Sequence, residues 1–99
     1  MMMKLFGWRK RNPLRELVRD RELLAARSPG GSQQRPIEVV SASVVEVRAR
    51  ALACPQCEGP FRVLEHRAPA SGLRQVAVRC ELCGVARDLW FRLVSRDPN

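Results

Sequence analysis

Long apolar runs are absent from this chain of 99 residues. No stretch reaches the roughly 18 residues that a membrane-spanning helix needs. Apolar residues Leu5, Phe6 and Trp8 come before the basic run Arg9-Lys10-Arg11, and the stretch is too short for a secretory signal. We therefore expect a cytoplasmic protein.

Features typical of enzyme active sites are also scarce. His66 is the only histidine, and the sequence offers no nucleophile to partner it. A glycine-rich phosphate loop and paired carboxylates at a useful spacing are missing as well. We therefore expect a protein without catalytic residues, with His66 on the surface of a hairpin.

Cysteine occurs only four times, as two C-x-x-C pairs with 22 residues between them: Cys54-Pro55-Gln56-Cys57 and Cys80-Glu81-Leu82-Cys83. Two thiolates three residues apart can chelate one ion from a tight turn, and a second such turn completes a tetrahedral shell. Disulfides and redox-active thiols are less favoured alternatives, because no signal peptide is visible and two pairs lie in a β-rich setting. Zinc and iron both accept four sulfur ligands. We expect Cys54, Cys57, Cys80 and Cys83 to hold one structural Zn²⁺.

Such a closed shell leaves no coordination position for water or substrate, which argues against metal-assisted hydrolysis.

Gly84 directly follows the last cysteine and can turn the backbone with positive φ. The first pair is instead followed by Glu58. We therefore expect a less regular first turn.

The two cysteine pairs and their neighbours resemble the zinc ribbon superfamily. The resemblance lies in Cys-Pro-Gln-Cys-Glu-Gly-Pro-Phe (54–61), a two-stranded excursion, and Arg-Cys-Glu-Leu-Cys-Gly (79–84) before a strand, and it covers roughly residues 44–94. It implies one structural zinc ion and a role in binding nucleic acid or other proteins. Rubredoxins share such turns, but this chain differs from them in its basicity, its long hairpin and its lack of tyrosine.

The hydrophobic pattern of the second half predicts strands. Alternating Val45, Val47, Ala49 and Ala51 indicate a strand that leads into the first cysteine pair. Residues 37–40 before it indicate either a separate short strand or an extended lead-in. A hairpin of 61–66 and 73–79 across 68–72, and a strand over 85–94, complete the pattern. In the last strand, the alternation of Leu89, Phe91 and Leu93 predicts that Phe91 belongs to the core, with Trp90 on the opposite face. We expect a small three- to four-stranded antiparallel zinc ribbon over residues 37–95, with 96–99 as a tail.

The first 27 residues predict a basic arm and one short amphipathic helix. Asn12 can cap the helix and Pro13 suits its first position, while the apolar stripe contains Leu14, Leu17, Val18 and Leu24. Residues 28–36 carry Pro29, Gly30, Gly31 and Pro36, and they predict a flexible linker.

The formal charge of +8 is concentrated near the N-terminus, where residues 1–36 hold nine Lys or Arg and three acids. An accessory role in contacting nucleic acid or a nucleic-acid machine is the leading hypothesis. Its expected contact residues are Trp8, Arg9, Lys10, Arg11, Arg74, Trp90 and Arg92.

Three further hypotheses stay open. The helix could dock on a partner protein or a second copy through its apolar stripe. Leu5, Phe6 and Trp8 could tether the chain to a membrane surface. The thiols could sense oxidants by releasing zinc. The oligomeric state is not predicted.

Overall fold

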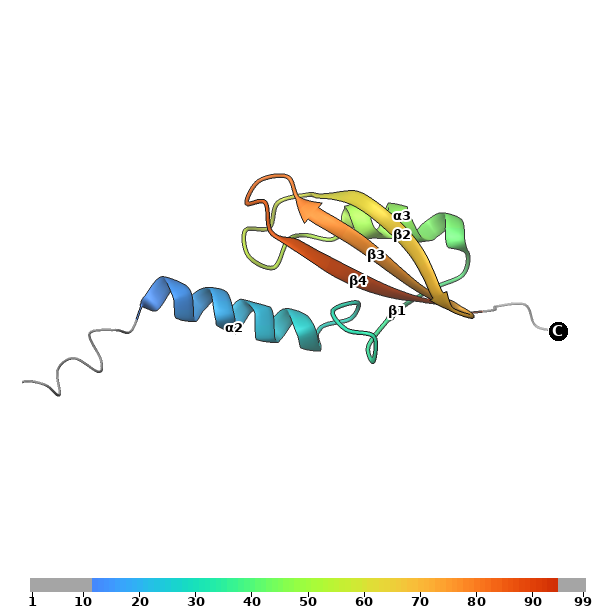
Figure 1. Ribbon diagram of the computed structural model, residues 1–99, viewed down its shortest axis with the longest axis horizontal. Helices are drawn as coiled ribbons and strands as arrows, with labels where there is room; N and C mark the ends of the chain where they lie inside the picture. Colours follow the sequence, from blue (N-terminus) through green and yellow to red (C-terminus); the bar gives the residue numbers. More distant parts are fainter. Residues whose placement is uncertain (1–11, 95–99) are drawn as a thin grey trace, which may run out of the picture.

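A four-stranded sheet with a helix packed on one face forms the body of the protein (Figure 1). The structure, a computed structural model, describes residues 12–94. Its elements in chain order are α2 (Pro13–Arg27), β1 (Ile37–Val39), α3 (Ala42–Ala51), β2 (Phe61–Ala70), β3 (Leu73–Cys80) and β4 (Ala86–Leu93). Neither helix in this part of the chain has the length and apolar character that crossing a membrane requires.

The sheet is mixed, which corrects the prediction of a purely antiparallel ribbon. Strands β2, β3 and β4 are antiparallel neighbours, and the full order is β1-β4-β3-β2. Strand β1 runs parallel to β4, with Ile37 opposite Phe91 and Val39 opposite Leu93. A parallel neighbour requires a long connection, and here helix α3 and the β2–β3 hairpin supply it. Of the two alternatives for residues 37–40, the structure has the short strand, over Ile37–Val39.

The hairpin and the last strand form as predicted, with different bounds. Strands β2 and β3 extend until only Ser71 and Gly72 separate β2 from Leu73, and Gly72 makes the turn with φ 74°. A register shift between Val63 and Glu65 leaves one extra residue in β2. In β4, Phe91 is fully buried, as expected from its alternation with Leu89 and Leu93.

The prediction of a strand before the first cysteine pair is wrong, because residues 42–51 form helix α3. Val45 and Ala49 lie one helical turn apart and are both fully buried, whereas Val47 is 62% exposed. Val44 and Leu52 extend the same helical face against the core. Helix α3 contacts all four strands and covers one face of the sheet. Without α3, the apolar side chains on that face would be exposed to water.

Helix α2 confirms the predicted N-terminal helix and its cap. The Asn12 Oδ1 atom accepts hydrogen bonds from the amides of Leu14 at 3.0 Å and Arg15 at 3.3 Å, and Pro13 opens the helix. None of the residues of α2 is buried. Figure 1 shows α2 below one end of the sheet, with its N-terminal part extending beyond the strands.

Residues 28–36 connect α2 to the sheet through a series of turns. Gly30 is buried at φ 84°, and its carbonyl accepts a hydrogen bond from the Trp90 amide at 2.9 Å. A Cβ atom at Gly30 would lie 2.7 Å from Ile37 Cδ1, so glycine allows this close approach. The flexible character assigned to this linker stays a prediction.

Candidate metal centre

Two similar turns carry the cysteine pairs at one end of the sheet, and we call them the first knuckle (54–57) and the second knuckle (80–83). In the first, the Glu58 amide donates to the Cys54 carbonyl at 2.7 Å; in the second, the Gly84 amide donates to the Cys80 carbonyl at 3.1 Å. The expectation of a less regular first turn is wrong. Glu58 adopts a positive φ of 65°, close to the 80° of Gly84.

The knuckles bring all four sulfur atoms together. Each sulfur lies within 4.8 Å of the other three, with Cys54 Sγ 3.7 Å from Cys83 Sγ and Cys57 Sγ 3.4 Å from Cys80 Sγ. These distances are far longer than a disulfide bond of about 2.05 Å. A tetrahedral ion with metal–sulfur bonds of about 2.3 Å would place its ligands about 3.8 Å apart. The four cysteines therefore fit a metal ion.

Hydrogen bonds from the backbone favour negative charge on the buried sulfurs. The amide of Gln56 points at Cys54 Sγ, and the amides of Leu82 and Cys83 point at Cys80 Sγ, all at 3.4 Å. The Cys83 amide, together with that of Leu82, lowers the pKa of Cys80 to about 6.

Negative charge on one sulfur disfavours ionisation of the neighbouring thiols. The Gly59 amide acts to lower the pKa of Cys57, but the sulfur of Cys80, burial and the other two cysteines outweigh it and raise the pKa to about 12. Four adjacent thiolates therefore need a cation among them. A bound metal ion would supply that charge and release the remaining protons.

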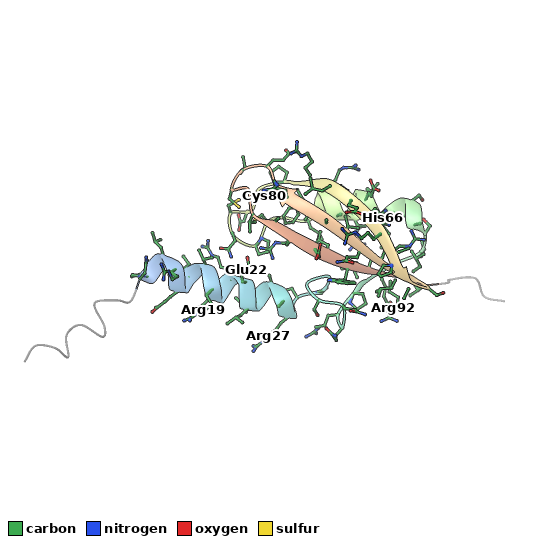
Figure 2. The ribbon with its side chains drawn as sticks, viewed as in Figure 1. Arg19, Glu22, Arg27, His66, Cys80 and Arg92 are labelled. Carbon is green, nitrogen blue, oxygen red and sulfur yellow. The ribbon has the colours of Figure 1, made fainter. Side chains whose placement is uncertain are left out.

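A polar cluster that no sequence pattern predicted lies between the first knuckle and α2. The Gln56 Nε2 atom donates to the Val18 carbonyl at 3.0 Å and to Glu22 Oε2 at 2.7 Å, and Arg87 of β4 donates to the same Glu22 oxygen at 2.5 Å. Arg21 Nη1 reaches the Gln56 carbonyl at 2.6 Å. Figure 2 shows Glu22 on the side of α2 turned toward the sheet.

The predicted contact residues divide between the two faces of the sheet. The face away from α3, here called the outer face, carries Arg62, Glu65 and Arg67 of β2, Gln75, Ala77 and Arg79 of β3, and Asp88, Trp90 and Arg92 of β4. Trp90 is half-buried and Arg92 is exposed. Arg74 lies opposite Phe91, on the face that α3 covers, so Arg74 does not share a surface with Trp90 and Arg92.

Arg74 and His66 take part in contacts on the α3 side. His66 Nδ1 lies 3.1 Å from Glu46 Oε2 of α3, and its Nε2 lies 3.5 Å from Arg74 Nη1. The His66 side chain is only 17% exposed. His66 belongs to β2, and its side chain lies between the sheet and α3. It is not part of the cysteine cluster.

The remaining predicted residues lie on α2 or outside the described part of the chain. Leu14, Leu17, Val18 and Leu24 are all exposed. Trp8, Arg9, Lys10 and Arg11 lie outside residues 12–94, as do Leu5 and Phe6.

Comparison of the chain with protein-family models, curated proteins and solved structures found no significant match. The resemblance to zinc ribbons therefore depends on the two knuckles and the cysteine cluster.

Proposed function

We propose that this chain is a zinc-binding ribbon module that contacts nucleic acid, or a nucleic-acid machine, through the outer face of its sheet and its basic N-terminal arm. Zinc suits the site because four thiolates match its preferred tetrahedral coordination. In a chain this short, bound metal would stabilise a fold with a small core.

One pair of residues carries the binding part of the proposal. Arg62 of β2 and Arg79 of β3 are directly opposite each other on the outer face, and both are exposed. Like charges directly opposite each other destabilise a sheet. Neither arginine forms an ion pair with another residue of the described range, although Arg79 Nη1 donates to the Gly84 carbonyl at 3.1 Å. A phosphate group would relieve the repulsion.

The surroundings of this pair agree with a polyanionic partner. Arg62 and Arg79, together with the acidic Glu81, line a concavity beside the second knuckle, with a volume of about 410 Å³. Farther along the same face, Trp90 offers an aromatic surface and Arg92 a further exposed cation. The acidic side chains of Glu65 and Asp88 lie between these two ends and limit the positive charge of the face.

Fluorescence anisotropy with labelled single-stranded and double-stranded DNA and RNA tests this proposal. We expect binding at low ionic strength that weakens steeply with salt. The double variant Arg62→Ser/Arg79→Ser should reduce the salt slope by about two, because each lost phosphate contact removes about one unit.

The matched control is Arg48→Ser/Arg50→Ser, which removes the same charge from α3 on the other side of the sheet. Absence of binding at low salt would contradict the nucleic-acid proposal. An equal loss in the control would show that total charge, rather than the outer face, is responsible.

A second candidate function, a protein-interaction module, is favoured by the exposed apolar stripe of α2. Leu24 is 65% exposed and no residue of α2 is buried, although isolated helices of this length are marginal in water. If this stripe docks on a partner or a second copy, Leu17→Glu/Leu24→Glu should abolish the complex measured by light scattering. The matched control is Leu23→Glu/Ala26→Glu, on a different side of α2.

A further inference from the structure

Gln56 connects the metal centre to helix α2. It lies between the ligands Cys54 and Cys57, and its amide points at Cys54 Sγ. Its side chain donates to two oxygens of α2, and its carbonyl accepts from Arg21 of the same helix. One residue of the first knuckle therefore makes three polar contacts with α2.

Apolar packing contributes little to holding α2 in place. A groove of about 290 Å³ remains between the C-terminal half of α2 and the ribbon, where Leu24 and Ala25 face Pro55, Phe61 and Leu89. Besides the contacts of Gln56, the ion pair of Glu22 with Arg87 links α2 to strand β4. The middle of α2 is thus fixed through the knuckle and one strand residue.

The backbone geometry of the first knuckle depends on whether an ion is bound to Cys54 and Cys57. A C-x-x-C turn that chelates an ion has its backbone fixed, whereas the same four residues without an ion lose two restraints, at Cys54 and at Cys57. Gln56 lies inside that turn, so the direction of its side chain and its carbonyl depends on the turn. The hydrogen bonds to Val18, Glu22 and Arg21 require both groups in their observed positions.

We infer that Gln56 is a positioning residue that couples metal binding to the docking of α2. Metal in the cysteine cluster holds Gln56 where α2 can bind it, and docked α2 in turn strengthens metal binding by the same factor. The inference uses the metal part of the proposed function and is independent of nucleic-acid binding.

Full-length, zinc-loaded protein tests this coupling with two measurements. Hydrogen–deuterium exchange reports the protection of amides in α2, and competition with a chelator of known affinity reports zinc affinity. In Gln56→Ala we expect faster exchange in α2 and a roughly two- to tenfold weaker zinc affinity, the range that corresponds to one or two lost hydrogen bonds.

Two further substitutions separate docking from a local change in the turn. Gln56→Lys keeps a donor for Glu22 and should restore both protection and affinity. Gln56→Glu places a second carboxylate beside Glu22 and should weaken both more than alanine does. The matched control is Gln75→Ala, on β3 and away from the knuckles, which should change neither quantity.

The coupling is overturned if α2 exchange in Gln56→Ala equals that of the parent protein while zinc remains bound. It is also overturned if zinc affinity falls with no change in α2, because Gln56 then acts within the knuckle alone. Failure of the parent protein to bind zinc is a separate result. It is detected by metal analysis before any variant is compared, and it would overturn the metal part of the proposed function too.

Discussion

Glu58 and Gly84 hold the same left-handed backbone at equivalent positions, each one residue after the second cysteine of its knuckle, with φ 65° and 80°. Each donates its amide to the carbonyl of the first cysteine in its pair. Glycine adopts this backbone without strain, whereas a residue with a Cβ atom is less stable in it by about 1–2 kcal/mol. The two turns are therefore alike in shape and unequal in strain.

Relief of this strain predicts that Glu58→Gly stabilises the zinc-loaded protein by about 1 kcal/mol, after the entropy that glycine adds to the unfolded chain is included. At the equivalent position of the second knuckle, Gly84→Ala introduces a Cβ atom and should destabilise the zinc-loaded protein by a similar amount. A Cβ atom at Gly84 would have no other atom within 4 Å, so backbone strain is the only cost.

Urea unfolding at saturating zinc measures both changes. The control is Glu81→Gly, which makes the same substitution in the second knuckle at a residue without positive φ. There glycine should lower the free energy of unfolding. A loss of stability in Glu58→Gly would contradict the proposed strain.

Local signals in the sequence predicted the cysteine cluster, the cap of α2 and the face of β4. The spacing of Cys54 and Cys57 sets a turn directly, and the side chain of Asn12 caps amides only two and three residues away. The alternation around Phe91 identified the buried side because a strand has a period of two. These features depend on neighbours in sequence, which the chain itself displays.

Helix α3 escaped prediction because its sequence satisfies two periods. Val45 and Ala49 are four residues apart, which fits one face of a helix and also one face of a strand. The choice depends on the sheet, which needs a cover over its apolar face. The contacts of Gln56 with Glu22, 34 residues away, carry no local signal at all.

Valine-to-alanine substitutions in α3 distinguish the helix from the strand. Val45→Ala removes a fully buried side chain and should cost about 2 kcal/mol. Val47→Ala changes an exposed helical residue and should stabilise the protein by up to about 0.7 kcal/mol, because alanine has the higher helix propensity. In a strand, both valines would lie on one face and both substitutions would destabilise. Thermal or urea unfolding of the two zinc-loaded variants shows whether each substitution raises or lowers the free energy of unfolding.

Removal of the metal should unfold the ribbon. Apparent binding energies of structural zinc reach about 10–16 kcal/mol at neutral pH, comparable to the whole stability of a small domain. A strong chelator should therefore abolish the strand signal in circular dichroism, and added zinc should restore it. An unchanged spectrum would contradict a structural role for the metal.

The identity of the metal is a separate prediction. Native mass spectrometry of purified protein should find one zinc ion per chain, and Cys83→Ser should weaken its retention. An iron site with four sulfur ligands would give a coloured protein. Metal analysis of protein expressed with both metals supplied is the direct comparison. Iron as the main occupant would contradict the zinc prediction.

The ion pair of Glu22 with Arg87 predicts how docking of α2 depends on pH. The Arg87 hydrogen bond, aided by that of Gln56, holds the pKa of Glu22 below its ordinary value of 4.5 against the opposing effect of burial. A lowered pKa means that docking favours the carboxylate. Its contribution is therefore complete above pH 4.5 and is lost as the pH falls through the lower pKa of the docked state.

Glu22→Gln mimics the protonated side chain and provides the test. At pH 7, amides of α2 should exchange faster in this variant than in the parent protein. The ratio of α2 amide protection in the parent protein to that in Glu22→Gln should stay constant down to about pH 5. It should approach one below the pKa of Glu22. Zinc content must be measured in the same samples, because acid also protonates the cysteines. A ratio that changes between pH 7 and 5 at constant zinc content would show that another group controls the docking of α2.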